Sequence, residues 1–135
     1  MEDSTLSELF WAVARRLRHL NRETLEPLNI SPSHGRALAV LLRHGSLRPG
    51  ALAEHLRIAA RSATEVVDDL EHRGLVRREP DPADRRATLV ALTDAGRASG
   101  DRIKAARKAE TERFFGALSA ADRAELTRIL RKLRD

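Results

Sequence analysis

Residues 81–96 read DPADRRATLVALTDAG, and this stretch decides the fold that we expect. The run ATLVALT has the alternation of apolar and polar residues that is typical of a β-strand. GLVRRE, at 74–79, is a second strand candidate. The segment PDPADRR, at 80–86, lies between the two, and we expect it to be a loop because its prolines cannot donate to a strand ladder. Arg85 and Arg86 are therefore expected at the tip of a β-hairpin.

The residues before the hairpin have the 3.6-residue period of helices. A short helix is expected to begin at Pro49 and to carry Leu52 and Leu56 on its buried side. Only the residues RIAA separate it from a second amphipathic helix, which is closed by Gly74. The buried side of this second helix carries Ala63, Val66, Val67 and Leu70. Two short helices joined this tightly predict a helix-turn-helix, and a hairpin directly after it makes a winged helix, with the hairpin as the wing.

Further helices flank this core on both sides. The first is expected to begin at Thr5, because Thr5 and Glu8 have the spacing of a capping box. Its apolar stripe consists of Leu6, Leu9, Phe10, Val13, Leu17 and Leu20. Ser31, Thr93 and Ser119 are predicted to cap three later helices.

These elements predict one domain over residues 1–135, mainly α-helical with a small β-hairpin. We expect the winged helix-turn-helix core at 31–92 and dimerisation helices at 4–22 and 94–134. The apolar stripes of the flanking helices have no obvious place in a compact winged helix. A second copy of the chain is the economical way to bury them, so we expect a homodimer.

The composition narrows the classes of function. The chain has 25 Lys and Arg residues against 20 Asp and Glu, and its net charge of +5 suits a polyanionic partner. It has no cysteine, and its five histidines lack the paired spacing of metal ligands. No phosphate-binding glycine loop, nucleophile elbow or H-E-x-x-H motif is present, so we expect no enzyme activity, no cofactor and no metal. No apolar run approaches a membrane span and the N-terminus is acidic rather than signal-like, so we expect a cytoplasmic protein.

Residues 52–96, LAEHLRIAARSATEVVDDLEHRGLVRREPDPADRRATLVALTDAG, resemble the multiple-antibiotic-resistance regulator (MarR) family of bacterial transcription factors. The family pattern is a helix pair, then G-L-V-x-R, then D-x-x-D-x-R, then an alternating strand that ends in L-T-x-x-G. The matching residues are Gly74, Leu75, Val76, Asp81, Asp84, Arg86, Leu92 and Thr93. The resemblance implies a dimeric repressor that binds a pseudo-palindromic operator in double-stranded DNA, with the fourth helix in the major groove and a wing arginine in the minor groove. It also implies a small anionic or aromatic ligand between the dimerisation helices and the winged helix.

The wing supplies the first set of candidate DNA contacts. A narrow minor groove has an enhanced negative potential, which suits an arginine on a stiff hairpin. We expect Arg86 to insert into the minor groove, Asp84 to orient it, and Arg85 to contact a phosphate. Arg77 and Arg78 are weaker candidates for phosphate contacts. The alternative is a solvated turn in which Asp84 and Arg86 pair locally.

The second helix of the helix-turn-helix supplies the second set of candidate DNA contacts. Arg61 lies near its N-terminus, where base contacts are made in helix-turn-helix docking. Ser62 and Thr64 can bond to phosphates or base edges. Glu65 has two interpretations, because it can accept a hydrogen bond from a cytosine amino group or pair with Arg61 four residues before it.

The same helix also carries acidic side chains, at Asp68, Asp69 and Glu71. This charge favours a rival function, in which the winged helix docks a protein instead of DNA. The wing favours DNA, and the fit to the whole pattern leads us to expect a sequence-specific DNA-binding regulator.

Trp11 lies away from the apolar stripe of the first helix, on a face rich in arginine. It is interpreted either as filler of the dimer interface or as a platform for an anionic aromatic ligand, with Arg15 and His19 beside it. His34, on the second helix, is a further candidate for the ligand cavity.

Overall fold

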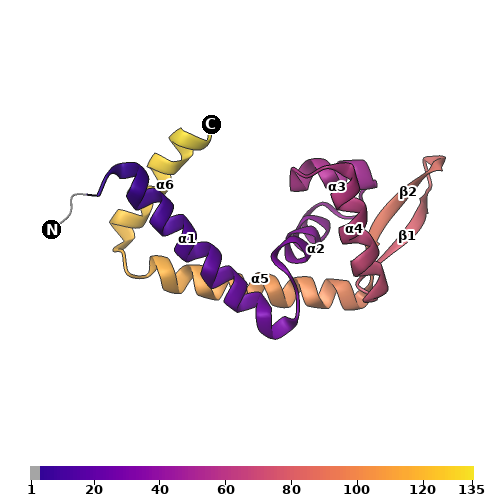
Figure 1. Cartoon of the computed structure of the whole chain (residues 1–135), viewed down its shortest axis with the longest axis horizontal. Coiled ribbons are helices and arrows are strands. Elements are labelled where there is room, and N and C mark those ends of the chain that lie inside the picture. The colour runs from indigo at the N-terminus through magenta and orange to yellow at the C-terminus, as the bar shows by residue number, and fades with distance from the viewer. Residues whose placement is uncertain (1–3) are drawn as a thin grey trace.

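The computed structural model describes residues 4–135 and shows a mainly helical chain with a two-stranded antiparallel sheet (Figure 1). The elements in chain order are α1 (Leu6–Leu25), the short 3-10 helix η1 (Glu26–Leu28), α2 (Pro32–His44), α3 (Pro49–Leu56), α4 (Ala60–His72), β1 (Val76–Asp81), β2 (Asp84–Leu92), α5 (Asp94–Phe115) and α6 (Ala120–Arg134). The helix-turn-helix of α3 and α4 is followed directly by the hairpin of β1 and β2. The predicted fold class is therefore confirmed.

Side-chain caps explain where four of the helices begin. Thr5 and Glu8 form the predicted capping box, in which each side chain accepts a hydrogen bond from the other residue's amide. Ser31, Thr93 and Ser119 each accept a hydrogen bond from the amide three residues further along. The predicted starts of α1, α2, α5 and α6 are therefore confirmed.

The hairpin is longer than the sequence pattern predicts. Its turn consists of Pro82 and Ala83 alone, because β1 and β2 pair on both sides of these residues. The predicted loop over 80–86 is therefore wrong, and the arginine pair lies in β2. Pro80 lies within β1 because each strand of a two-stranded sheet has a free edge, and proline is tolerated where no ladder hydrogen bond needs its missing N–H.

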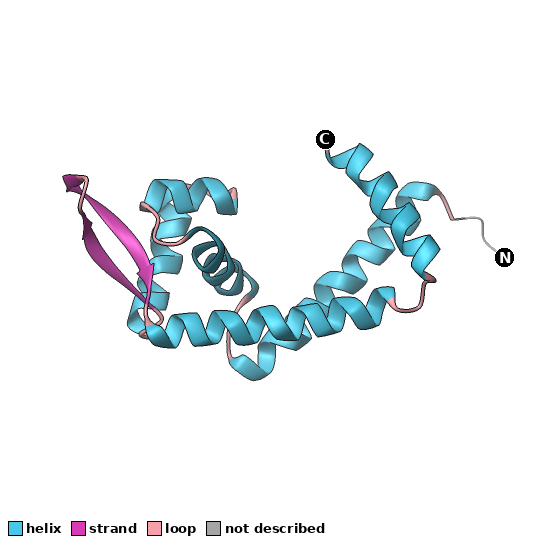
Figure 2. Cartoon of the chain, turned by 180° about the vertical axis from the view of Figure 1, so that it is seen from behind, coloured by secondary structure: helices cyan, strands magenta, loops and turns pink. Residues whose placement is uncertain are grey.

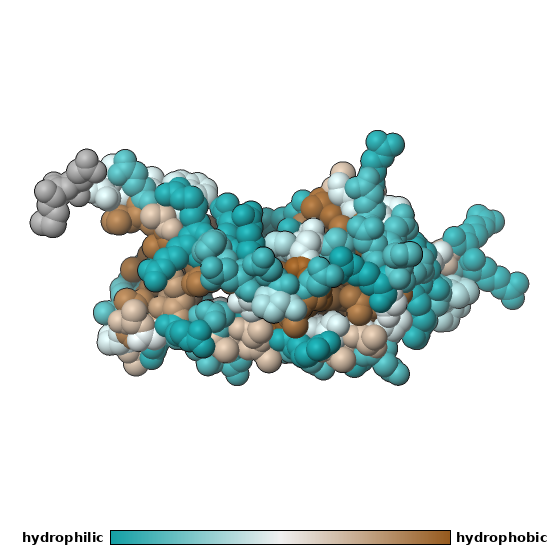
Figure 3. All heavy atoms as spheres, turned by 60° about the horizontal axis from the view of Figure 1, so that its bottom comes forward, coloured by the Kyte–Doolittle hydropathy of each residue, from teal (hydrophilic) through white to brown (hydrophobic). Residues whose placement is uncertain are grey.

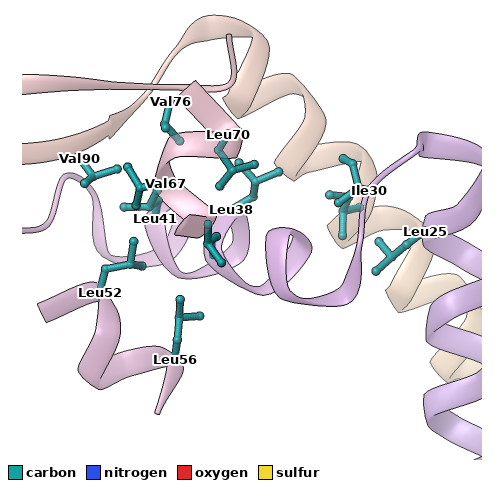
Figure 4. Packing of buried hydrophobic residues seen from close by; sticks show 13 residues of the cluster. Leu25, Ile30, Leu38, Leu41, Leu52, Leu56, Val67, Leu70, Val76 and Val90 are labelled. Carbon is teal, nitrogen blue, oxygen red and sulfur yellow. The ribbon is translucent and has the colours of Figure 1, made fainter. Parts of the chain in front are cut away.

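An apolar core joins the helix-turn-helix to the base of the wing. α2, α3 and α4 contribute buried leucine and valine side chains, each strand contributes one valine, and Leu25, Ile30 and Ile103 belong to the same cluster (Figure 4). The labelled members include Leu38, Leu41, Leu52, Leu56, Val67, Leu70, Val76 and Val90. Leu47 also pairs with Val90 through two backbone hydrogen bonds of 3.1 and 2.7 Å. The base of the wing is thus fixed to the helices.

α5 begins directly against the base of the wing. Thr93 donates its amide to the Leu75 carbonyl (3.1 Å) and its hydroxyl to the Gly74 carbonyl (2.6 Å). Gly96 lies so close to the same segment that a Cβ atom on it would be 1.8 Å from the Leu75 carbonyl oxygen. Only glycine fits this approach, which is the physical reason for the last residue of the L-T-x-x-G pattern.

α5 also connects the two ends of the molecule. Figures 1 and 2 show it running from the base of the wing, past α2, to α1 and α6. At that end large apolar side chains are exposed, and Figure 3 shows hydrophobic surface beside the N-terminus. They are Leu6, Leu9, Phe10, Trp11 and Val13 of α1, with Ile129, Leu130 and Leu133 of α6. Within residues 4–135, none of the helices is both long and apolar enough to cross a membrane.

Candidate nucleic-acid interface

Two carboxylates shape the backbone at the tip of the wing. Asp81 accepts a hydrogen bond from the Ala83 amide (2.9 Å), and Asp84 accepts one from the Arg86 amide (3.0 Å). Asp84 therefore holds the backbone of Arg86 rather than its guanidinium. Arg85 and Arg86 are both exposed and, in the part of the chain that the structure describes, neither forms an ion pair.

The tip of the wing is tied to the start of α3. Nε and Nη2 of Arg48 lie 2.9 and 2.8 Å from the Oδ2 atom of Asp81, which is a nearly buried residue. The hydrogen bond from the Ala83 amide, and then the one from Arg48, lower the pKa of the Asp81 carboxyl because both favour its charged form. Asp81 is thus a charged anchor within the wing.

The first turns of α4 present the predicted contact residues to solvent. Arg61, Ser62, Thr64 and Glu65 are all exposed. Thr64 donates its hydroxyl proton to the Ala60 carbonyl (3.0 Å), which leaves the lone pairs of its oxygen for a further contact. Of the ion pairs within residues 4–135, none joins Arg61 to Glu65. The contact between Glu65 and a base stays a prediction.

The acidic side chains further along α4 face other parts of the same fold. Arg78 on β1 lies 2.6 Å from Asp68 and 2.7 Å from Glu71. The hydrogen bond to Asp68 is the main cause that raises the pKa of Arg78, and the bond to Glu71 adds to it against the effect of burial. Asp69 lies 3.3 Å from Nε2 of His34 on α2. The acidic side chains that favoured a protein partner thus have partners within the fold, on β1 for Asp68 and Glu71 and on α2 for Asp69.

The two arginines of β1 differ in their availability to DNA. Arg77 is exposed, and its one ion pair among the described residues is with Glu79 of its own strand, at 3.1 Å. The guanidinium of Arg78 is paired with two carboxylates of α4, and their negative charge opposes the approach of a phosphate. An exposed pair such as that of Arg77 exchanges partners at little cost. Of the two predicted phosphate contacts, the geometry favours Arg77.

The predicted ligand residues do not converge on one site. Trp11 is half exposed and packs edge-on against Phe10, with the ring centroids 5.7 Å apart. Arg15 and His19 are exposed further along α1. His34 lies on α2 and faces the carboxylate of α4 described above. Trp11, His19 and His34 thus have different partners in the described structure, and the ligand site stays a prediction.

A cavity lies between α2 and α5, and the sequence did not indicate the residues that line it. Its volume is about 470 Å³, and it is lined by Ala39, Leu42, Arg43, Ile103, Lys104 and Arg107. Arg107 is partly buried, and its Nε atom is enclosed without a hydrogen-bond partner in the described structure. Burial, followed by the charge of Arg36, lowers the pKa of Arg107. Three cations around an apolar floor fit an anion with an apolar body. Lys104 and Arg107 are neighbours on α5, and the packing of α2 on α5 adds Arg43 to them.

Sequence comparisons relate this architecture to known regulators. The sequence model of the MarR family matches residues 30–88. The chain is 38% identical to an HTH-type transcriptional regulator of Mycobacterium leprae over 109 residues. This stretch covers 81% of this chain and 71% of that protein. It is 29% identical to the HTH-type transcriptional repressor MdtR of Bacillus subtilis, over 98% of this chain and 84% of that protein.

A solved structure extends the similarity to the whole fold. A mutant of MarR from E. coli, complexed with operator DNA, matches with a TM-score of 0.82 and 27% identity over 95% of this chain and 92% of that chain. Because MarR proteins are transcriptional regulators, these matches also confirm that the chain is not an enzyme. The order of the helices, the wing and the matched residues together show that this chain belongs to the MarR family of winged-helix transcriptional regulators.

Proposed function

We propose that this chain is a homodimeric repressor that binds a pseudo-palindromic DNA operator. α4 enters the major groove and reads bases through Arg61 and Thr64, while Arg86 enters the adjacent minor groove. The observation that carries the proposal is the exposure of the wing arginines. Within residues 4–135, Arg85 and Arg86 are exposed and form no ion pair, and the base of their hairpin is buried in the core. A guanidinium held ready in this way is suited to phosphate and to the negative minor groove.

The charges of α4 support DNA over a protein partner. Asp68 and Glu71 are paired with Arg78, which leaves the first turns of α4 with Arg61, the hydroxyls of Ser62 and Thr64, and Glu65 as their one acidic side chain. The N-terminal end of a helix also favours a phosphate. The acidic surface that a rival protein-docking function needs is reduced accordingly.

The exposed apolar side chains of α1 and α6 support a homodimer. Phe10 and Trp11 are each about half exposed, and Leu6 and Leu133 are more exposed still. Large apolar patches of this kind are unusual on a monomer surface and mark interaction sites. A second copy covers both helices at once, and its two-fold symmetry matches a pseudo-palindromic operator.

The cavity between α2 and α5 supports release by a small ligand. It lies where the winged helix meets a dimerisation helix. A bound ligand there would change the spacing between the two winged helices of the dimer. We assign the site to a carboxylate with an apolar body, held by Arg43, Lys104 and Arg107 over Leu42 and Ile103. Benzoate should raise the melting temperature of the wild type, benzamide should not, and Arg107→Gln should abolish the difference. Equal effects of the two compounds would overturn this assignment.

The DNA-binding proposal is tested by selection from randomised duplex DNA at about physiological salt. The wild type should enrich a two-fold-related motif with half-sites roughly one helical turn apart. Arg86→Ala should weaken binding to that motif by roughly 1–3 kcal/mol, the scale of one good DNA contact. Arg102→Ala removes the same charge from an exposed position on α5 and serves as the matched control. If nothing is enriched and binding disappears with added salt, the basic charge binds DNA without specificity and the proposal fails.

A further inference from the structure

Arg48, the residue before α3, contacts Asp81 at the outer end of β1. Both Nε and Nη2 of Arg48 reach Oδ2 of Asp81, while Oδ1 of Asp81 accepts the Ala83 amide. Only 10% of the Asp81 side chain is exposed, against 51% of the Arg48 side chain. Both oxygens of the carboxylate are therefore used, and solvent screens this pair less than a fully exposed one.

Arg48 occupies a position that usually serves the helix itself. It is the N-cap of α3, where Ser, Thr, Asp and Asn are favoured because their side-chain oxygens accept from the first amides of the helix. Arg48 forms no capping hydrogen bond, and α3 begins with Pro49, which has no N–H to satisfy. The guanidinium at this position is directed to the wing instead.

The outer part of the wing needs such a contact, because a two-stranded hairpin is marginally stable by itself. The base is held by buried Val76 and Val90 and by the backbone pairing of Leu47. Residues 79–88 extend beyond this base and project away from the helices (Figure 1). Within residues 4–135, the contact from the N-cap of α3 is the sole hydrogen bond or ion pair that joins this outer part to another element.

We propose that Arg48 is a positioning residue, which sets where Arg86 meets the minor groove. Asp81 lies opposite Asp84 across the hairpin, and Asp84 holds the Arg86 amide. A tilt of the outer hairpin therefore moves Arg86 relative to α4. The bond to Asp81 fixes this tilt and so fixes the spacing between major-groove and minor-groove contacts. The inference rests on the proposed function.

A half-exposed arginine beside a DNA-reading helix has a simpler use, which is to bind a phosphate directly. The two roles predict opposite effects of Asp81→Asn. If Arg48 bound a phosphate, this change would remove a competing negative charge and strengthen DNA binding. If Arg48 acts through Asp81, the change weakens binding, because the new amide nitrogen faces the donors of Arg48 while the amide oxygen still accepts from Ala83.

The test uses the full chain and the operator that the wild type selects. Arg48→Ala and Asp81→Asn are measured alone and combined with Arg86→Ala. We expect each single change to weaken binding about tenfold, within the roughly 5- to 150-fold range of one good DNA contact. In the Arg86→Ala background each change should weaken operator binding by less than about twofold, because the minor-groove contact of Arg86 is already absent.

Footprinting separates the two grooves. Hydroxyl-radical protection of the minor groove beside each half-site should weaken in both single variants, while protection of guanine N7 from dimethyl sulfate in the major groove should remain. Circular dichroism and thermal unfolding establish that the variants are folded, and Arg48→Lys, which keeps the charge, should recover part of the affinity.

Three outcomes overturn the inference. If the Asp81→Asn variant binds the operator as tightly as the wild type, or more tightly, Arg48 contacts a phosphate instead. Equal losses with and without Arg86 would show that the pair does not act through this residue. If the wild type selects no operator, both the proposed function and this inference fail. If the wild type selects a motif and the variants bind it unchanged, this inference alone fails.

Discussion

Arg78 on β1 and Asp68 on α4 form a hydrogen-bonded ion pair in which Nη2 and Oδ1 are 2.6 Å apart. The contact joins the wing to the helix that we propose to read the major groove, and a second bond to Glu71 strengthens it. It also neutralises acidic groups that would otherwise face a polyanion. We therefore expect Arg78 to serve DNA binding from within the fold rather than through a phosphate contact.

Arg78→Met keeps the apolar stem of the side chain and removes its charge. Each partly exposed ion pair contributes roughly 0.2–1 kcal/mol, so we expect the free energy of unfolding to fall by about 1 kcal/mol. Operator affinity should also fall, because Asp68 and Glu71 are left without their cation. Urea unfolding and operator titration measure the two effects. Arg77→Met is the control, and equal stability losses in the two variants would contradict this account.

Gly96→Ala should destabilise the chain, because its Cβ atom would overlap the Leu75 carbonyl oxygen. Overpacking of this kind costs about 1–3 kcal/mol or more. Gly100→Ala, on the same helix, is the matched control, since its Cβ atom would meet Leu42 at an ordinary 3.5 Å. Alanine is favoured over glycine in a helix by about 1 kcal/mol, so this control should be stabilising. Thermal unfolding that moved in the same direction for both variants would refute the close approach at Gly96.

The Asp81 carboxyl should titrate below the ordinary range of aspartate, because the Ala83 amide and Arg48 hold its pKa down. A carboxyl whose pKa is lower in the folded than in the unfolded chain stabilises the fold above the unfolded pKa. This contribution is lost as the pH falls through the folded pKa, so the window lies below about pH 4. Carbon NMR of the Asp81 carboxyl measures the midpoint. Arg48→Ala should raise it only in part, since the Ala83 amide remains, and a wild-type midpoint at the ordinary value would contradict the prediction.

Phe10→Glu should convert the expected dimer to a monomer without loss of the fold. The side chain is 49% exposed in the single chain, so a charge there is tolerated by the protomer but not inside an apolar interface. Light scattering after size exclusion gives the mass, and circular dichroism reports the fold. Ala98→Glu puts the same charge on an exposed position of α5 and should leave the mass unchanged. A wild type that is monomeric at micromolar concentration would disprove the dimer.

Local signals in the sequence were sufficient for the order of the helices and for the starts of most of them. Thr5, Ser31, Thr93 and Ser119 cap the helices predicted from them, because an N-cap acts on amides only two or three residues away. The change of period after Gly74 likewise predicted the hairpin. The extent of the loop was not predictable in this way, since Pro80 is excluded from a central strand but not from an edge.

The residues expected to contact DNA came from the sequence, but their availability was decided by tertiary structure. Arg77 and Arg78 are neighbours of the same type, and only the packing of β1 beside α4 commits Arg78 to Asp68. Arg48 and Asp81 are distant in sequence, and neither residue by itself predicts their contact.

By itself the sequence determined the helix starts, the winged-helix order and the arginine pair of the wing, because periodicity, capping and turn chemistry act over a few neighbouring residues. The folded chain alone decided which charges are free, where the cavity with Arg107 lies and how the wing is held. Coulomb interactions and burial depend on distances in space, and these are set only when remote segments pack together.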